Sequence, residues 1–326
     1  MTKNYAGIDL GSNSCKIVIC DEDKKVLYKD NTSTRLAEGM YKNNRITDEA
    51  IERSQKCFYE YRQMIDKYNV AKENVRAITT AACRMAENGG DLVKKIQDES
   101  GINLEIISGQ EEAELNLKGA MEHVLGKSEY VVVYDLGGAS TEVTLAKNSK
   151  NPEIISTVSI PWGARNSSEA FDLVEYDEKK ANKLRKEIDK NLDVFFAKAE
   201  DISKKDVAFV ATSSTPLRLV SMIRQFGSYD RDKADGVVMS KSEMDEAISK
   251  ILNAKREDLA KNPYIGDKRS YIFISASVIF KQIYDRLGVD KVTASLKSAK
   301  DGIVSELIEK DKSKNLLARG NNGKAH

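Results

Sequence analysis

The sequence is poor in the residues that build disulfide frameworks, zinc sites and histidine-based catalytic triads. Its 326 residues include four cysteines, at positions 15, 20, 57 and 83 with no Cys-x-x-Cys pair, and two histidines. A disulfide scaffold, a structural zinc centre and a Ser-His-Asp triad are therefore all poorly supplied. Scattered thiols of this kind are typical of a reducing compartment, so we predict a cytoplasmic protein.

The chain also lacks long apolar runs and an excess of either charge. No run approaches the roughly 20 apolar residues that a membrane helix needs, and a strand-like segment that begins at Tyr5 argues against a signal peptide. Lys and Arg total 52 against 51 Asp and Glu, which gives a net charge of +1. Because nucleic acid-binding surfaces carry a large basic excess, we predict neither a membrane nor a nucleic-acid partner.

Short apolar runs alternate with helical patterns along the chain, which predicts an α/β protein. Strands are expected at residues 5–10, 16–20, 25–28, 75–79, 104–107, 130–134, 141–145 and 207–211. Helices are expected at 47–68, 91–100, 109–124, 179–196, 240–252, 275–287 and 301–308.

A glycine-containing turn occurs twice, 126 residues apart, as Asp9-Leu-Gly-Ser-Asn-Ser14 and Asp135-Leu-Gly-Gly-Ala-Ser-Thr141. Each turn joins two strands, whereas Rossmann and P-loop turns lead into a helix. Small residues in such a turn let backbone N–H groups converge on phosphate oxygens, and the Asp at each strand end can hold Mg²⁺. The alternative is a pair of ordinary hairpins, since Asp-x-Gly is common in turns. The repetition favours phosphate binding.

The repeated turn also divides the chain into two similar halves. A chain of 326 residues is longer than one core usually organises. We predict domains of residues 1–126 and 127–310, with a cleft between them, and a disordered polar tail of residues 311–326.

Two adjacent carboxylates lie between the turns, in Ser108-Gly-Gln-Glu-Glu112. Ser108 and Glu111 have the spacing of a helix capping box, which accounts for Glu111. Adjacent helical residues point about 100° apart, so Glu112 does not belong to the same cap. Glu112 could orient or deprotonate a water molecule beside bound phosphate, or it could simply complement the helix dipole.

Five ordered motifs together resemble the exopolyphosphatase and guanosine pentaphosphate phosphohydrolase (Ppx/GppA) family of the actin-like ATPase superfamily. They are the two turns, the Glu112 segment, Arg35-Leu-Ala-Glu-Gly39 and Thr80-Ala-Ala-Cys-Arg-Met-Ala-Glu-Asn88. The resemblance runs from Gly7 to about Leu307, in the short form of the family. It implies two ribonuclease-H-like domains around an active-site cleft, and release of terminal orthophosphate from inorganic polyphosphate, guanosine pentaphosphate (pppGpp to ppGpp), or both.

The resemblance further implies roles for individual residues and a homodimeric state. Glu112 would be the general base for the attacking water. Asp135 and Glu142, with Asp9, would support Mg²⁺, or Mn²⁺ in its place. Phosphate would be held by Arg84 and by residues of the two turns, namely Gly11, Ser12, Asn13, Ser14, Gly137, Gly138, Ala139, Ser140 and Thr141.

The chain departs from the family where glycines are expected. Ala139 replaces the third glycine of the second turn, at a cost on the order of 1 kcal/mol if that position needs a positive φ. A later segment, which is rich in glycine in the family, has the sequence Ala211-Thr-Ser-Ser-Thr215 in this chain. These changes favour altered substrate choice, and they keep open a regulator that binds (p)ppGpp or polyphosphate with little turnover. An actin-like kinase or ATPase is less favoured, because the Glu112 segment suits attack by water.

Overall fold

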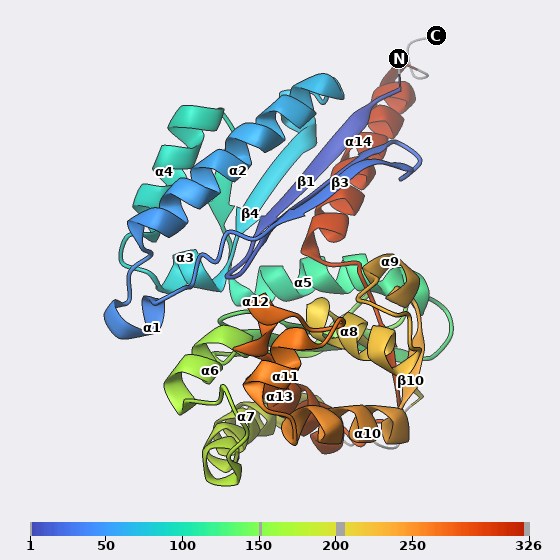
Figure 1. The fold of residues 1–326 in the computed structure, drawn as a ribbon. Coiled ribbons are helices and arrows are strands. Elements are labelled where there is room, and N and C mark those ends of the chain that lie inside the picture. Colours follow the sequence, from blue (N-terminus) through green and yellow to red (C-terminus); the bar gives the residue numbers. More distant parts are fainter. Residues whose placement is uncertain (1, 150–151, 200–205, 323–326) are drawn as a thin grey trace.

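Two β-sheets organise the protein, whose computed structural model describes residues 2–149, 152–199 and 206–322 (Figure 1). The first sheet has the strand order β3-β2-β1-β4-β5, and the second has the order β10-β11-β9-β6-β7-β8. The predicted α/β architecture in two similar halves is confirmed.

The first sheet combines an antiparallel meander with two parallel strands. Strands β1, β2 and β3 pair antiparallel, and β1 pairs parallel with β4, which pairs parallel with β5. Its strands are β1 (Asn4–Leu10), β2 (Cys15–Asp21), β3 (Val26–Thr32), β4 (Val75–Thr79) and β5 (Leu104–Ile106). Its helices and short turns are α1 (Met40–Asn43), α2 (Asp48–Lys67), η1 (Lys72–Asn74), α3 (Ala81–Met85) and α4 (Gly89–Ser100). The next two elements, α5 (Gly109–Ala120) and η2 (Met121–His123), pack against the second sheet.

The second sheet repeats this plan and adds one strand. Strands β6, β7 and β8 pair antiparallel, β6 pairs parallel with β9, and β9 with β11, while β10 is antiparallel to β11. Its strands are β6 (Tyr130–Leu136), β7 (Thr141–Lys147), β8 (Ile154–Ile160), β9 (Val207–Thr212), β10 (Val238–Ser240) and β11 (Lys291–Ala294). The helices in this part of the chain are α6 (Ala164–Phe171), α7 (Glu178–Ala199), α8 (Ser214–Ile223), α9 (Arg231–Ala234), α10 (Lys241–Leu252), α11 (Arg256–Lys261), α12 (Asp267–Ser270) and α13 (Phe273–Arg286), and the last helix is α14 (Ala299–Asn322).

The last helix, α14, covers the first sheet rather than the second. Figure 1 shows it beside β1 and β3, on the face opposite α2 and α4. Val304 and Ile308 pack with Tyr5, Val18 and Cys20 in one buried cluster. The predicted division at residue 126 assigns this helix to the second half. It packs on the first sheet instead, because it buries the apolar side chains of β1 and β2 that would otherwise be exposed to water.

The same helix corrects the predicted disorder of residues 311–326. It continues to Asn322, and residues 323–326 lie outside the described part of the chain. Asp311 accepts hydrogen bonds from Lys3 Nζ (2.8 Å) and Tyr5 Oη (3.0 Å). These bonds tie the predicted tail to the first strand. Over the described ranges, no helix combines the length and the apolar character of a membrane span.

Candidate active site

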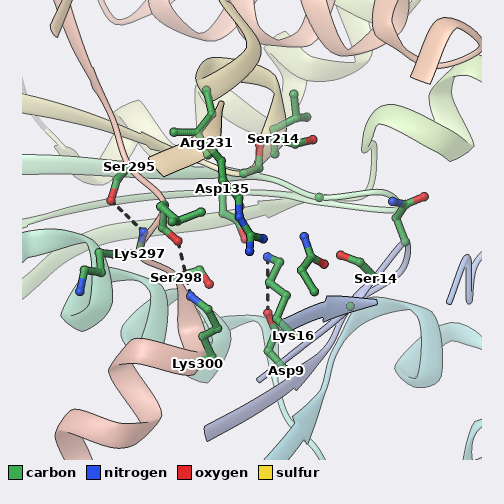
Figure 2. Close-up of a pocket in the computed structure, with 18 of the residues that line it drawn as sticks. Asp9, Ser14, Lys16, Asp135, Ser214, Arg231, Ser295, Lys297, Ser298 and Lys300 are labelled. Carbon is green, nitrogen blue, oxygen red and sulfur yellow. Dashed lines mark hydrogen bonds and ion pairs between the residues drawn. The ribbon is translucent and has the colours of Figure 1, made fainter. Parts of the chain in front are cut away.

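A cavity of about 220 Å³ lies between the two halves and is lined by residues from both. Both predicted turns reach it, since Gly11 and Gly138 are on its wall. Polar side chains enter from β1 and β2 on one side and from β6, α8 and α9 on the other, as Figure 2 shows for Asp9, Ser14, Lys16, Asp135, Ser214 and Arg231. The cleft expected from the repeated halves is therefore present.

The two turns have the same internal geometry. Gly11 N–H donates to Ser14 O, and Gly137 N–H donates to Ser140 O, each at 3.0 Å. The turns also meet, because a Cβ on Gly138 would lie 3.1 Å from Ser12 Cβ. We name residues 11–14 loop 1 and residues 137–141 loop 2. Both lie where a single ligand could contact them together.

Glu112 lies on the cavity wall in the first turn of α5. Only 7% of the residue is exposed, and its Oε2 atom has no hydrogen-bond partner among the described residues. Burial raises the pKa of Glu112 well above its usual range, and the nearby Glu142, Asp9 and Asp135 raise it further. Arg84 opposes this shift from 3.9 Å. A buried carboxylate with an unused oxygen and a raised pKa is a stronger base than an exposed glutamate and is suited to accept a proton.

Asp135 and Glu142 are held by hydrogen bonds from neighbouring elements. Asp135 accepts from Thr212 Oγ1 (2.8 Å) and from Asn116 Nδ2 (3.2 Å). Glu142 accepts from Ser159 Oγ (2.9 Å), while its buried Oε2 has no partner within the described ranges. Burial, together with the charge of Asp135, raises the pKa of Glu142 to about 7.

Stability is expected to fall as the pH rises, because these carboxylates resist ionisation in the fold. The pKa of Glu142 is about 7 in the fold against an ordinary value of 4.5, so the folded state binds more protons than the unfolded state between these pH values. This contribution is fully present below pH 4.5 and is lost as the pH rises through 7. Glu142→Gln is expected to raise the free energy of unfolding by on the order of 2 kcal/mol at about pH 8 and to change it little at about pH 4.

Urea unfolding of the wild type and Glu142→Gln at both pH values measures this difference. Glu153→Gln is the control, because Glu153 is exposed and ion-pairs with Lys147 at the surface (2.6 Å). Equal pH slopes for the wild type and Glu142→Gln would contradict the raised pKa.

Lysine and arginine side chains also line the cavity. They were not predicted from the sequence as site residues. Lys16 Nζ lies 3.8 Å from Asp9 Oδ2, and Lys300 Nζ bonds to Asp301 Oδ2 (2.5 Å). Burial alone would lower the pKa of Lys16, but Asp9, Asp135 and Asp301 more than offset it, so Lys16 stays charged. The other cations on the wall are Lys29, Arg231, Arg269 and Lys297. They come from four separate segments, so no local sequence pattern connects them.

Several predicted phosphate ligands do not face the cavity. Arg84 is not on its wall and donates to Ile107 O (2.7 Å). Thr141 Oγ1 donates to Trp162 O (2.7 Å). Ala139 packs into the core of the first half and has no positive φ, so the predicted strain there is wrong. The turn geometry at this position suits alanine as well as glycine.

The strained position of the cleft is Ser213 instead. Its φ of 87° and ψ of −180° lie in a region that glycine adopts readily and other residues rarely do. Ser213 lines the cavity in the segment where glycines were expected, and its buried Oγ has no partner in the described part of the chain. The departure from the family pattern therefore has a conformational cost at Ser213 and none at Ala139.

Two helix-capping expectations at α5 are met in part. Ser108 is the N-cap, and its hydroxyl accepts from Glu111 N–H (3.1 Å). The carboxylate of Glu111 does not return to the cap, because it pairs with Arg76 (2.6 Å). Asn116, which the prediction missed, follows Glu112 by four residues and therefore shares its helix face. That four-residue spacing from Glu112 could have predicted Asn116 as a site residue.

The carboxylates of the cleft fit a hard divalent cation by charge, without forming a complete cage. Asp9, Glu112 and Asp135 line the cavity, whereas Glu142 is not on its wall and lies close enough to Asp135 for their charges to interact. Glu112 and Glu142 each keep a buried oxygen without a hydrogen-bond partner among the described residues. Among the described residues, no three His, Cys, Asp or Glu side chains are placed to hold a metal ion together. Mg²⁺ usually binds through one or two carboxylates, several waters and the phosphates of a substrate. The donor set therefore suits a cation that shares its coordination with substrate.

The chain matches the model of the Ppx/GppA phosphatase family over residues 17–311. A bifunctional 3-dehydroquinate synthase/phosphatase of Fusobacterium nucleatum is 30% identical over 317 residues, which are 93% of this chain and 46% of that protein. The chain thus spans about half the length of this relative.

Solved structures of similar fold cover almost the whole chain. An exopolyphosphatase-like protein aligns with a TM-score of 0.86 and 23% identity over 94% of this chain and 99% of its own. An exopolyphosphatase of Cytophaga hutchinsonii aligns with a TM-score of 0.84 and 22% identity over 94% and 98%. The Aquifex aeolicus member of the Ppx/GppA family aligns with a TM-score of 0.75 and 23% identity over 95% and 99%. At these identities the likeness shows a shared fold.

Proposed function

The chain belongs to the Ppx/GppA phosphatase family, and from this premise we propose that it is a phosphoanhydride hydrolase. Its substrates are inorganic polyphosphate, guanosine pentaphosphate, or both, and the product is terminal orthophosphate. The observation that carries the proposal is the carboxylate of Glu112, which lines a cavity shared by two matching turns and whose Oε2 atom has no hydrogen-bond partner among the described residues.

Phosphate groups are held in this proposal by loops 1 and 2. The backbone N–H groups of Asn13 and Gly138 make no hydrogen bond within the described part of the chain, and both residues line the cavity. Converging N–H groups of this kind stabilise anionic oxygens, and more so as charge develops on them during transfer. Lys16 and Lys300 add positive charge to the same cavity.

Glu112 takes the proton of the attacking water in this proposal. Its raised pKa makes the carboxylate a stronger base than an exposed glutamate. Water activation by one carboxylate suits phosphoryl transfer, in which positioning and electrostatic stabilisation supply most of the catalysis. The resulting protonated Glu112 can return its proton to solvent or to the released phosphate.

Asp135, Glu142 and Asp9 would hold Mg²⁺, or Mn²⁺, together with phosphate oxygens of the substrate. The cation would supply neutralisation of charge on the phosphoanhydride. A binding regulator without turnover is the second candidate, favoured by the strained Ser213 at the cavity wall. The homodimer expected from the family likeness stays a prediction.

Orthophosphate release, measured side by side on polyphosphate and guanosine pentaphosphate, tests this proposal. We expect release from at least one substrate with Mg²⁺ and a loss of release when the cation is chelated. Tight calorimetric binding of either compound without released phosphate would establish the binding regulator instead. Absence of both release and binding, with Mg²⁺ or with Mn²⁺, would overturn both.

A further inference from the structure

Arg165 contacts both phosphate loops at once. Its backbone N–H donates to Gly138 O in loop 2 (2.8 Å), and its Nη2 donates to Asn13 Oδ1 in loop 1 (2.8 Å). Asn13 lines the cavity, whereas Arg165 lies behind the loops and is not on the wall. One residue at the start of α6 therefore connects turns that are 126 positions apart in the sequence.

The charge of Arg165 is not neutralised by a carboxylate at this site. Over the described ranges it forms no ion pair, and its buried Nε has no hydrogen-bond partner. Burial lowers the pKa of Arg165, with Glu38 and Glu169 opposing that effect from a distance. Burying a guanidinium without a paired carboxylate costs free energy. The bond from Arg165 to the neutral amide of Asn13 is therefore the interaction that needs an explanation.

The chemistry of the two groups fixes how the Asn13 amide is turned. A guanidinium has only donors, so the amide oxygen must face Arg165 and the NH₂ group must face away from it. The atom of Asn13 left for the cavity is therefore Nδ2, a hydrogen-bond donor. A donor at this wall, beside the free N–H of Gly138, suits a phosphate oxygen.

We propose that Arg165 is a positioning residue that turns the Asn13 amide so that Nδ2 donates to a phosphate oxygen of the bound substrate. It also keeps loop 1 and loop 2 in contact while the substrate is held. This inference rests on the proposed function, because it takes a phosphate chain as the ligand.

Kinetics of phosphate release by Arg165 variants give the first test. Arg165→Met is expected to lower kcat/KM by about 10-fold to 100-fold, the range for losing an oriented bond to a charged group. Arg165→Lys keeps a donor and is expected to fall between the wild type and Arg165→Met. Arg286→Met is the matched control, since Arg286 pairs with Asp189 (2.8 Å) and Asp193 (2.7 Å) far from the loops, and it is expected to stay within about twofold.

Asn13→Asp separates a positioning role from a purely structural one. The new carboxylate still accepts the Arg165 bond, now as a charged pair, so the tie between the loops is kept. It has no N–H to offer phosphate, and it adds negative charge at the wall. We expect Asn13→Asp to lose as much kcat/KM as Arg165→Met while melting no lower than the wild type. Wild-type kinetics in both variants would overturn the proposal.

Binding of tripolyphosphate, measured by calorimetry in the Glu112→Gln background, distinguishes this inference from the proposed function. A wild type that releases no phosphate contradicts the hydrolase, whatever the variants do. In the binding assay, a Kd that rises about 10-fold or more with Arg165→Met supports the positioning role. An unchanged Kd in both Arg165→Met and Asn13→Asp overturns it.

Discussion

Replacing Glu112 with Gln is expected to lower kcat for phosphate release by about 10³-fold, within the range for loss of a general base. The amide keeps the size and place of the side chain but cannot take a proton from water. Ligand binding is expected to persist or to tighten, because one of four neighbouring negative charges disappears from the cleft. Initial rates and calorimetric titration with tripolyphosphate measure the two effects separately.

Glu111→Gln is the matched control for this substitution. Glu111 is the adjacent carboxylate of the same helix turn, but it pairs with Arg76 outside the cavity (2.6 Å). Its replacement is expected to change kcat by less than about twofold, since exposed ion pairs contribute little. A Glu112→Gln variant as active as Glu111→Gln would remove Glu112 from the proposed mechanism.

The pH profile of the wild type follows from the same carboxylate. Because the pKa of Glu112 is raised by burial and by its acidic neighbours, the basic form is lost at a higher pH than for an exposed glutamate. Activity is therefore expected to decline as the pH falls, and to do so at a higher pH than an exposed glutamate would give, whereas the stability of the protein rises as the pH falls. Initial rates of phosphate release across the pH range measure the activity profile. Opposite pH trends of activity and stability are expected when several carboxylates are buried close together in an active-site cleft.

The central strands are predictable from the sequence because they are buried on both faces. β1 and β6 have no exposed residue, and residues 130–134 of β6 form a continuous apolar run, Tyr-Val-Val-Val-Tyr. β8 is missed, because it is an edge strand whose side chains are mostly half-exposed. The helices α6 and α8 are missed because they are short, and α8 carries Pro216 in its first turn.

The position of α14 could not be predicted from local patterns. The period of Ile303, Val304 and Ile308 predicts a helix with one apolar face, but the same face would fit either sheet. Its true place follows from contacts with strands some 300 residues earlier, such as the bond of Asp311 to Tyr5. Long-range packing of this kind is not encoded in any window of the sequence.

The site is predictable where its chemistry repeats and unpredictable where it comes from ordinary residues. Glu112 stands out because the capping-box spacing accounts for Glu111 but gives Glu112 no role in the cap. Arg165 and Lys16 give no such signal, since an arginine at a helix start and a lysine in a strand are common at the surface. Only the folded chain shows that one connects the loops and the other faces Asp9.

The second large effect is expected from Gly302→Ala, at the crossing of α14 and α5. The two helix backbones touch there: a Cβ on Gly302 would overlap the carbonyl oxygen of Leu115, and one on Gly119 would overlap that of Ser298. Neither obstacle is a flexible side chain, so the helices must separate. We expect a loss of about 3 kcal/mol in the free energy of unfolding, at the upper end for overpacking.

Activity is expected to fall with stability, because Leu115 follows Glu112 by three residues on the helix that must move. A displacement of about 1 Å at a reacting group lowers rates by about 100-fold. Gly90→Ala in α4 is the control, since no atom lies within 4 Å of its Cβ position; it is expected to stabilise by about 0.5–1 kcal/mol and to leave kcat unchanged. Urea unfolding and phosphate release of both variants decide the matter. If Gly302→Ala matched Gly90→Ala in both assays, the glycine contact between α5 and α14 would not be what holds Glu112 at the cavity.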